Sequence, residues 1–222
     1  EVLNLIFDSG GTAPSGFASD AVMQFLETVR LRSLSVELLF GAFRQRELLA
    51  ACVAVEAPGR SALVFAGPTG ALSSDREVAM VEVLRLMHIG AISRRIALLE
   101  ALVDPNDAVR ATVLAQTGFR RLTQLFYLRR LVNTHAVGVQ ELEIDWLPYA
   151  MEHAAVFEQA LERSYDQTHD CPELTGIRSP AEVLAGHRAA GEFDSRLWWV
   201  GLRGGRPVGV LLLAPMPENE AM

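Results

Sequence analysis

The fold of this chain is decided by the stretch IALLEALV (96–103), DPND (104–107) and AVRATVLAQTGF (108–119). The first eight residues are apolar except for one glutamate, and they are few enough for a strand buried on both faces in the middle of a sheet. Asp104 is a good helix N-cap, Pro105 fits the first helical position, and a further aspartate places negative charge in the first turn. The stretch therefore predicts a strand followed closely by a helix.

Gly118 marks the end of the predicted helix. Glycine readily adopts the left-handed conformation after a last helical turn. Phe119 then packs back onto Leu114, as in a Schellman ending. The helix is therefore expected to close with an apolar contact.

A second strand and helix precede this stretch. Residues 60–67 are apolar and short enough for a strand, and Ser74 with Glu77 forms the pattern of a capping box that opens a helix. That helix is expected to end near Gly90. A strand, a helix and a strand in this order predict a right-handed parallel crossover, with residues 96–103 as the second strand.

The order of predicted elements resembles that of the GNAT N-acetyltransferase superfamily. The resemblance rests on this order over residues 1–133 and on the segment 104–121, which is similar to the last helix motif of that family. A predicted final strand, 122–130, follows the motif. The resemblance implies an α/β (α+β) fold, with a mixed twisted sheet flanked by helices.

The chain also contains an internal repeat of a predicted hairpin. Residues 38–43 and 48–55 predict two antiparallel strands around a short turn. Residues 197–214 match residues 38–55 without a gap at an offset of 159 (199 − 40). Two predicted helices precede each hairpin, so the pattern indicates a tandem protein. The alternative is that two unrelated hairpins look alike.

These patterns predict a GNAT-like domain over residues 1–133, a linker over 134–142 and the N-terminal part of a second GNAT-like domain over 143–222. Pro148 is expected to open the first helix of the second copy, and a capping-box pattern at Ser179 is expected to open the next helix. The second copy stops where its fourth strand is expected. We therefore expect the sequence to be a fragment of a longer tandem protein.

Composition indicates a globular protein and excludes several chemistries. Of the 222 residues, 50% are hydrophobic and 21% are charged. The net charge of −7 is the sum of +1 over residues 1–133 and −8 over residues 134–222. All 20 basic residues are arginine, which excludes P-loop lysines, Schiff bases and lysine general bases. The arginines are scattered or offset by acids, so no nucleic-acid partner is expected.

The sequence predicts a cytoplasmic protein that does not enter a membrane. No run of eighteen or more apolar residues lacks charges, and no signal-peptide pattern opens the chain. Cys52 and Cys171 are too few for a disulfide framework. The histidines show no metal-ligand spacing, so no metal is expected.

The resemblance implies acetyl-CoA as the cofactor. In GNAT enzymes acetyl-CoA lies in a V between two splayed parallel strands, with its pyrophosphate on backbone N–H groups at a helix N-terminus. The matching segment, 66–74, contains glycines but lacks the preceding arginine or glutamine, and a simple turn is the alternative. The residues implied to bind acetyl-CoA are Phe65, Ala66, Gly67, Gly70 and Asn106.

Many GNAT enzymes use a tyrosine on the last helix to protonate the leaving thiolate, but this chain has Leu114 at that position. Tyr127, on the following predicted strand, is a candidate substitute, and a structural tyrosine is the alternative. Glu100 is a candidate base beside the expected cleft, where a carboxylate can deprotonate an amine through water. A structural glutamate, paired or reaching the surface, is the alternative. Glu100 and Tyr127 are therefore the predicted catalytic residues.

The segment 168–178 connects the two predicted helices of the second copy. In GNAT proteins this connection forms one wall of the acceptor-substrate site. The resemblance therefore implies that His169, Asp170 and Cys171 bind the substrate. Loop packing, with an Asx-turn at Asp170, is the alternative.

The resemblance implies an acyl-CoA-dependent N-acyltransferase that moves an acetyl group from acetyl-CoA to an amine of a small molecule or a peptide. The amine would attack the thioester directly, and a carboxylate or water would take its proton. The alternative is a catalytically silent first copy. Such a copy would act as a structural lobe, or as the dimerisation lobe of a homodimer, beside an active second copy.

Overall fold

The computed structural model describes five segments of the chain, namely residues 2–7, 17–68, 72–126, 143–169 and 171–215. The chain divides into two compact units, Glu1–Arg120 (unit 1) and Arg121–Met222 (unit 2). None of the helices in these segments is both long enough and apolar enough to cross a membrane.

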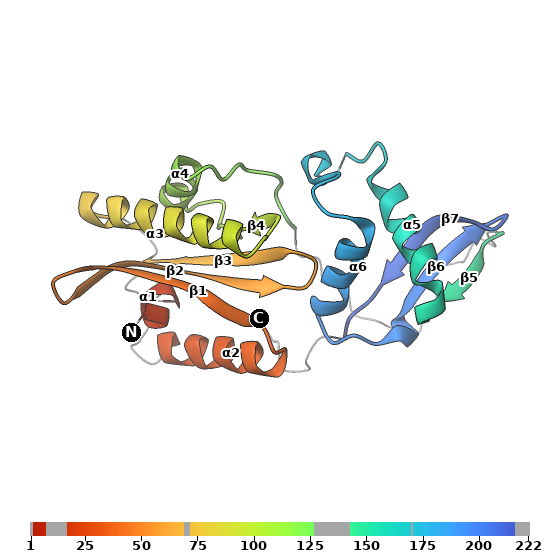
Figure 1. Ribbon diagram of the computed structural model, residues 1–222, viewed down its shortest axis with the longest axis horizontal. Helices are drawn as coiled ribbons and strands as arrows, with labels where there is room; N and C mark the ends of the chain where they lie inside the picture. Colours follow the sequence, from red (N-terminus) through yellow and green to blue (C-terminus); the bar gives the residue numbers. More distant parts are fainter. Residues whose placement is uncertain (1, 8–16, 69–71, 127–142, 170, 216–222) are drawn as a thin grey trace. The chain divides into compact units, whose positions relative to one another are not determined.

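Unit 1 is a mixed sheet with helices on both faces (Figure 1). Its elements are α1 (Val2–Phe7), α2 (Phe17–Leu31), β1 (Ser35–Arg44), β2 (Glu47–Ala57), β3 (Ser61–Gly67), α3 (Ser74–Ser93), β4 (Leu98–Glu100) and α4 (Ala108–Gln116). The strand order is β1-β2-β3-β4; the first two pairings are antiparallel and β3 runs parallel to β4. The prediction of a mixed α/β sheet flanked by helices is therefore confirmed.

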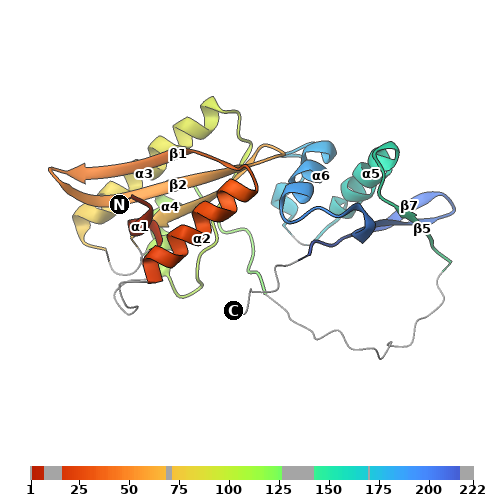
Figure 2. The same cartoon turned by 90° about the horizontal axis from the view of Figure 1, so that it is seen from below.

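Side chains alternate between the two faces of β2 and so build two cores. On one face Cys52 lies in a buried cluster with Leu84 of α3, which α4 extends. On the other face Ala51 and Val53 are buried together with Ile6 of α1. Figure 2 shows α1 and α2 crossing the sheet on the side opposite α3. β2 is therefore an interior strand with a core on each of its faces.

The predicted parallel crossover from β3 through α3 to β4 is confirmed, but the predicted strand 96–103 is wrong in length and position. Only Leu98–Glu100 is strand, it is half-buried, and β4 lies at the edge of the described sheet. A central position would need a further strand beside β4. Residues 122–126, the start of the predicted final strand, have no regular structure, and 127–130 lie outside the described residues.

α4 begins four residues after the predicted N-cap. Asp107, rather than Asp104, is the N-cap, and its Oδ1 accepts a hydrogen bond from the backbone N–H of Arg110 at 2.9 Å. Asp104 instead accepts from the backbone N–H of Asn106 at 2.8 Å, in a turn that precedes the helix. Both aspartates are suitable caps, and the turn places the second one at the helix start.

The end of α4 is as predicted. Gly118 has φ 91°, and the backbone N–H of Phe119 donates to the carbonyl of Leu114 at 3.1 Å. Gly118 donates to Ala115 at 3.1 Å, which completes a Schellman motif. Phe119 packs against the buried cluster that contains Leu114, as the predicted ending requires.

One of the two predicted capping boxes forms. At the start of α6 (Pro180–Ala189), Ser179 Oγ accepts from the N–H of Glu182, and the Glu182 carboxylate accepts from the N–H of Ser179. The box predicted at Ser74 is wrong, because the N-cap of α3 is Ser73 and makes no side-chain cap hydrogen bond. α3 also runs three residues beyond the predicted Gly90, to Ser93.

Unit 2 is an antiparallel sheet of order β5-β6-β7 with two helices (Figure 1). Besides α6, its elements are β5 (Asp145–Pro148), the short 3-10 helices η1 (Met151–His153), η2 (Pro172–Leu174) and η3 (Ser195–Leu197), α5 (Ala154–Tyr165), β6 (Trp198–Arg203) and β7 (Arg206–Leu212). Its core is aromatic, and the Tyr149 ring packs edge-on against Phe157 and Trp198.

The sequence did not predict β5. Pro148 was expected to open a helix, but it is the last residue of β5, opposite Trp199 of β6, and α5 begins only at Ala154. A proline is tolerated at the end of an edge strand, where its missing N–H leaves no ladder bond unmade. β7 pairs with β6, and no second partner strand exists for it in the described part of unit 2.

The two hairpins agree in register as well as in sequence. β1 and β2 pair Arg44 with Glu47, and β6 and β7 pair Arg203 with Arg206, both across two-residue turns. Each hairpin has a register shift at the same place, after Ala42 in one and after Gly201 in the other, again 159 residues apart (201 − 42). The shared register shift adds a structural likeness to the sequence match of the two hairpins.

Candidate ligand-binding site

The parallel strands β3 and β4 separate after a short common stretch. Residues 61–63 pair with Leu98–Glu100, and the pairing ends there. Residues 64–67 continue along β2, whereas 101–104 leave the strand conformation. On its β4 side, the second half of β3 therefore has no partner strand among the described residues.

A pocket lies at the end of β3, between that strand and the helices α3 and α4. The space that it encloses is about 10 Å³, enough for about one water molecule. Ala66, Pro68, Leu72, Met80, Leu84, Asp107, Val109, Arg110, Val113 and Leu114 line it. Its walls are apolar except for the neighbouring pair of Asp107 and Arg110.

Arg110 is the cation of this pocket and is only partly satisfied. Its Nε lies 3.3 Å from Asp107 Oδ2, and the two side chains are 23% and 19% exposed. Its Nη2 is buried and has no hydrogen-bond partner within the described segments. A buried donor without an acceptor is costly, so this nitrogen calls for a water molecule or a ligand atom as a partner.

The residues predicted to bind acetyl-CoA are only partly brought together. Ala66 lines the pocket. The Phe65 side chain does not line the pocket, because strand alternation turns its ring to the opposite face, where the ring centroids of Phe7 and Phe25 lie 5.6 and 5.8 Å away. Gly70 lies outside the described residues.

Gly67 and Asn106 have structural explanations. A Cβ added to Gly67 would lie 2.5 Å from the Cα of Ile6, so glycine allows the backbone of α1 to cross the end of β3. Asn106 is exposed and sits in the turn before α4, and it does not line the pocket. Neither prediction gains support from contacts with the pocket.

Only one of the two predicted catalytic residues lies in the described part of the chain. Glu100 ends β4 opposite Leu63, half-buried and outside the pocket lining. Tyr127 lies outside the described residues. Leu114, at the position of the family's tyrosine, is buried and lines the pocket, as expected for a core residue.

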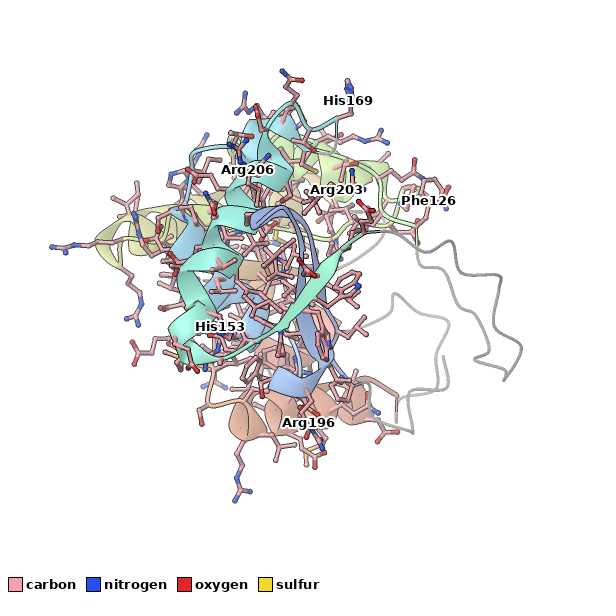
Figure 3. All side chains as sticks on the ribbon, turned by 90° about the vertical axis from the view of Figure 1, so that its right-hand side faces the viewer. Phe126, His153, His169, Arg196, Arg203 and Arg206 are labelled. Atoms are coloured by element: carbon pink, nitrogen blue, oxygen red, sulfur yellow. The ribbon has the colours of Figure 1, made fainter. Side chains whose placement is uncertain are left out.

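The predicted substrate residues belong to unit 2. His169 is exposed, and Figure 3 shows it at the outer end of the loop that follows α5. Cys171 is half-buried with a left-handed backbone, φ 50°, directly before η2. Asp170 lies outside the described residues. In the segments that the structure covers, no three His, Cys, Asp or Glu side chains are arranged to hold a metal ion.

Cys52 is excluded as a nucleophile. It lies beneath α3, fully buried, and its Sγ donates to the Val83 carbonyl at 3.4 Å. Burial raises the pKa of the Cys52 thiol to about 12, so the thiolate does not form at neutral pH.

Sequence reasoning missed Arg110, although the chain contains a signal for it. Arg110 precedes Val113 by three residues and Leu114 by four, so helical periodicity places it on the buried face of α4. A charged residue on such a face calls for a partner or a ligand. The signal was masked because the N-cap, and with it Asp107, was placed incorrectly.

No family model, no curated protein and no solved structure matches this chain.

Proposed function

We propose that unit 1 is a GNAT-like module that binds an acyl-CoA, and that the protein is an N-acyltransferase that moves an acetyl group from acetyl-CoA to an amine. The observation that carries the proposal is the end of the β3–β4 pairing after Leu63 and Glu100, which leaves residues 64–67 of β3 without a partner strand on that side among the described residues. The resemblance implies that acetyl-CoA lies between two parallel strands of this kind where they splay apart.

The residues of the pocket match the chemistry of the acyl-bearing arm, although the pocket must widen from its enclosed space of about 10 Å³ to admit it. Its walls are apolar, and the buried Nη2 of Arg110, which carries two N–H groups, has no acceptor within the described residues. The unpaired side of residues 64–67 offers backbone groups of the kind that bind an extended chain. These features support binding of the acyl-bearing arm of acyl-CoA more directly than binding of its nucleotide.

Acetyl-CoA would supply an activated acetyl group as a thioester. In this proposal Glu100 takes the proton of the attacking amine through water, and Tyr127 protonates the leaving thiolate. The amine is that of a small molecule or a peptide.

The likeness of the two hairpins supports a second GNAT-like copy in unit 2. Helix ends agree as well: α1 and α5 end at Phe7 and Tyr165, and α2 and α6 end at Leu31 and Ala189. The spacing is 158 in both cases (165 − 7 and 189 − 31), one residue from the hairpin offset. In this proposal unit 2 begins with a strand, β5, and repeats the first elements of unit 1.

A catalytically silent unit 1 is the second candidate, and a specific observation favours it. The pocket lining contains one acidic side chain, Asp107, which is paired with Arg110, and Leu114 stands where the family has its tyrosine. In this reading unit 1 is a structural or dimerisation lobe.

Isothermal titration with acetyl-CoA separates the two candidates. We expect micromolar binding to the 222-residue chain. The matched variant is Val109→Trp, because Val109 lines the pocket but is 38% exposed, so a larger ring there fills the pocket mouth without entering the core. Loss of binding in this variant supports the acyl-CoA site, whereas absence of binding by the unmodified chain leaves the silent lobe.

A further inference from the structure

We propose that the sheet of unit 2 binds a partner's amphipathic helix with an acidic first turn, on the face that α5 and α6 leave uncovered. We call this surface the open face, and its residues are Trp146, Trp199, Gly201, Gly209, Leu211 and Leu213. The inference goes beyond the proposed acyl-CoA function, because it concerns unit 2 and needs no ligand in unit 1.

The open face is apolar and accessible to a partner. Both α5 and α6 share a buried cluster with Val200 of β6, and strand alternation places that side chain on the opposite face of the sheet. Three side chains of the open face are 56%, 42% and 48% exposed, namely Trp146, Leu211 and Leu213. Neighbouring exposed apolar side chains of this size are typical of an interaction surface.

The hairpin register identifies the equivalent face of unit 1. At the offset of 159, Trp199 corresponds to Phe40 (199 − 40). Leu211 corresponds to Cys52 (211 − 52), and Phe40 pairs with Cys52 as Trp199 pairs with Leu211. Phe40 packs in the cluster that α3 covers, and Cys52 Sγ donates to the carbonyl of Val83 on α3 at 3.4 Å. In unit 1 a helix therefore covers the face that is open in unit 2.

Small residues lie beneath the helix position in both units. Ala42 pairs with Ala50, and both pack in the cluster that α3 covers. The equivalent pair in unit 2 is Gly201 and Gly209 (201 − 42 and 209 − 50). No atom lies within 4 Å of a Cβ added to Gly209, so an apolar side chain of a helix has room there.

Ion pairs at the hairpin tip of unit 1 hold the first turn of α3. Arg44 Nη1 lies 2.7 Å from Asp75 Oδ2, and Glu47 Oε1 lies 3.3 Å from Arg76 Nη2. The two tip residues thus bind one acid and one base of the helix.

The charges at the hairpin tip of unit 2 specify a different first turn. The equivalent residues are Arg203 and Arg206 (Figure 3), at the same offset (203 − 44 and 206 − 47). Both are exposed, and neither has an ion-pair partner among the described residues. An arginine stands where unit 1 has Glu47, so the matching helix carries an acid where α3 has Arg76. Acids in a first turn also suit the helix dipole.

The probes are two synthetic peptides of residues 73–94, one unmodified and one with Arg76→Glu. Neither contains tryptophan, and all three tryptophans of the chain lie in unit 2, so their fluorescence reports binding there. We expect a saturable blue shift as Trp146 and Trp199 are covered, with the Arg76→Glu peptide binding about threefold more tightly. In the Arg206→Glu variant of the chain, the unmodified peptide should bind more tightly instead.

A second pair of variants tests the open face itself. Leu211→Asp places a charge under the helix and should weaken binding about tenfold. The matched control is Leu86→Asp, because Leu86 is 49% exposed and lies on α3 of unit 1. This control should bind like the unmodified chain. If Leu211→Asp does not melt cooperatively, Leu213→Asp replaces it with the same expectation.

Three results overturn the inference: no blue shift with either peptide, equal binding by Leu211→Asp and Leu86→Asp, or a peptide preference that Arg206→Glu does not invert. A chain that sediments as a dimer and that Leu211→Asp dissociates also overturns it, because a second copy then covers the open face. All of these results leave the proposed acyl-CoA function standing, since acetyl-CoA titration measures that function separately.

Discussion

Gly67 lies where the backbone of α1 crosses the end of β3. An added Cβ would lie 2.5 Å from the Cα of Ile6, and a backbone atom cannot turn aside as a flexible side chain can. We expect Gly67→Ala to destabilise unit 1 by about 1–3 kcal/mol, the range for overpacking a filled interior. Urea unfolding, monitored by far-UV circular dichroism, measures this loss of stability. Gly209→Ala in β7 is the control, since no atom lies within 4 Å of its added Cβ, and equal losses in both variants contradict the crossing.

Because of Cys52, the stability of unit 1 should decrease as the pH rises above 9. Burial raises the pKa of its thiol from 9.0 to about 12, so the folded state keeps a proton that the unfolded state loses. This contribution is complete below pH 9 and is lost as the pH rises from 9 to 12, at about 1.4 kcal/mol per pH unit. From pH 7 to pH 10, the free energy of unfolding should therefore decrease more for the unmodified chain than for Cys52→Ala. An equal fall in both proteins would show that the thiol is not protected.

The residues of the site were harder to predict than the fold, and strand alternation explains why. Ala66 and Phe65 are neighbours in the sequence, yet one lines the pocket and the other packs on α1. A motif matched to a loop of the family predicts where the site lies along the chain. It does not predict on which face of the sheet each side chain lies. Arg110 was overlooked for the related reason that its importance depends on which aspartate caps α4.

At the scale of single elements, predictions held where the signal was local and unique. The β1–β2 hairpin, the crossover through α3 and the Schellman ending at Gly118 each rest on short-range patterns and were confirmed. The predicted length of β4 was wrong because an apolar run becomes a strand only where a partner strand lies beside it. β5 was missed because four residues that end in proline carry little strand signal.

The two capping-box patterns give a matched prediction at the start of two helices. Ser179 makes both bonds of the box at α6, whereas Ser74 is the first residue of α3 and makes no cap. We expect Ser179→Ala to destabilise unit 2 by about 1 kcal/mol and Ser74→Ala to leave unit 1 within about 0.5 kcal/mol of its original stability. Thermal unfolding of both variants measures the difference. Similar losses at the two sites would contradict the assigned N-caps.

At the scale of the whole molecule, each unit has a hydrophobic core of its own. The cluster around Cys52 and Leu84 belongs to unit 1, and the aromatic cluster around Phe157 and Trp198 belongs to unit 2. Folding units with separate cores unfold as separate cooperative transitions unless a large interface couples them. The repeated hairpin fits this division, because each copy contributes to the core of its own unit.

Tryptophan fluorescence can test this independence, since all three tryptophans, Trp146, Trp198 and Trp199, lie in unit 2. Trp198 is 2% exposed, so its emission reports the unfolding of that unit, whereas far-UV circular dichroism reports both units. We expect Gly67→Ala to shift the circular dichroism transition to lower urea and to leave the fluorescence midpoint unchanged. Phe157→Leu, which opens a space beside Tyr149 in the aromatic core, should shift the fluorescence midpoint and the unit 2 part of the circular dichroism transition. If Gly67→Ala moves the fluorescence midpoint as far as the circular dichroism midpoint, the two units unfold as one cooperative body.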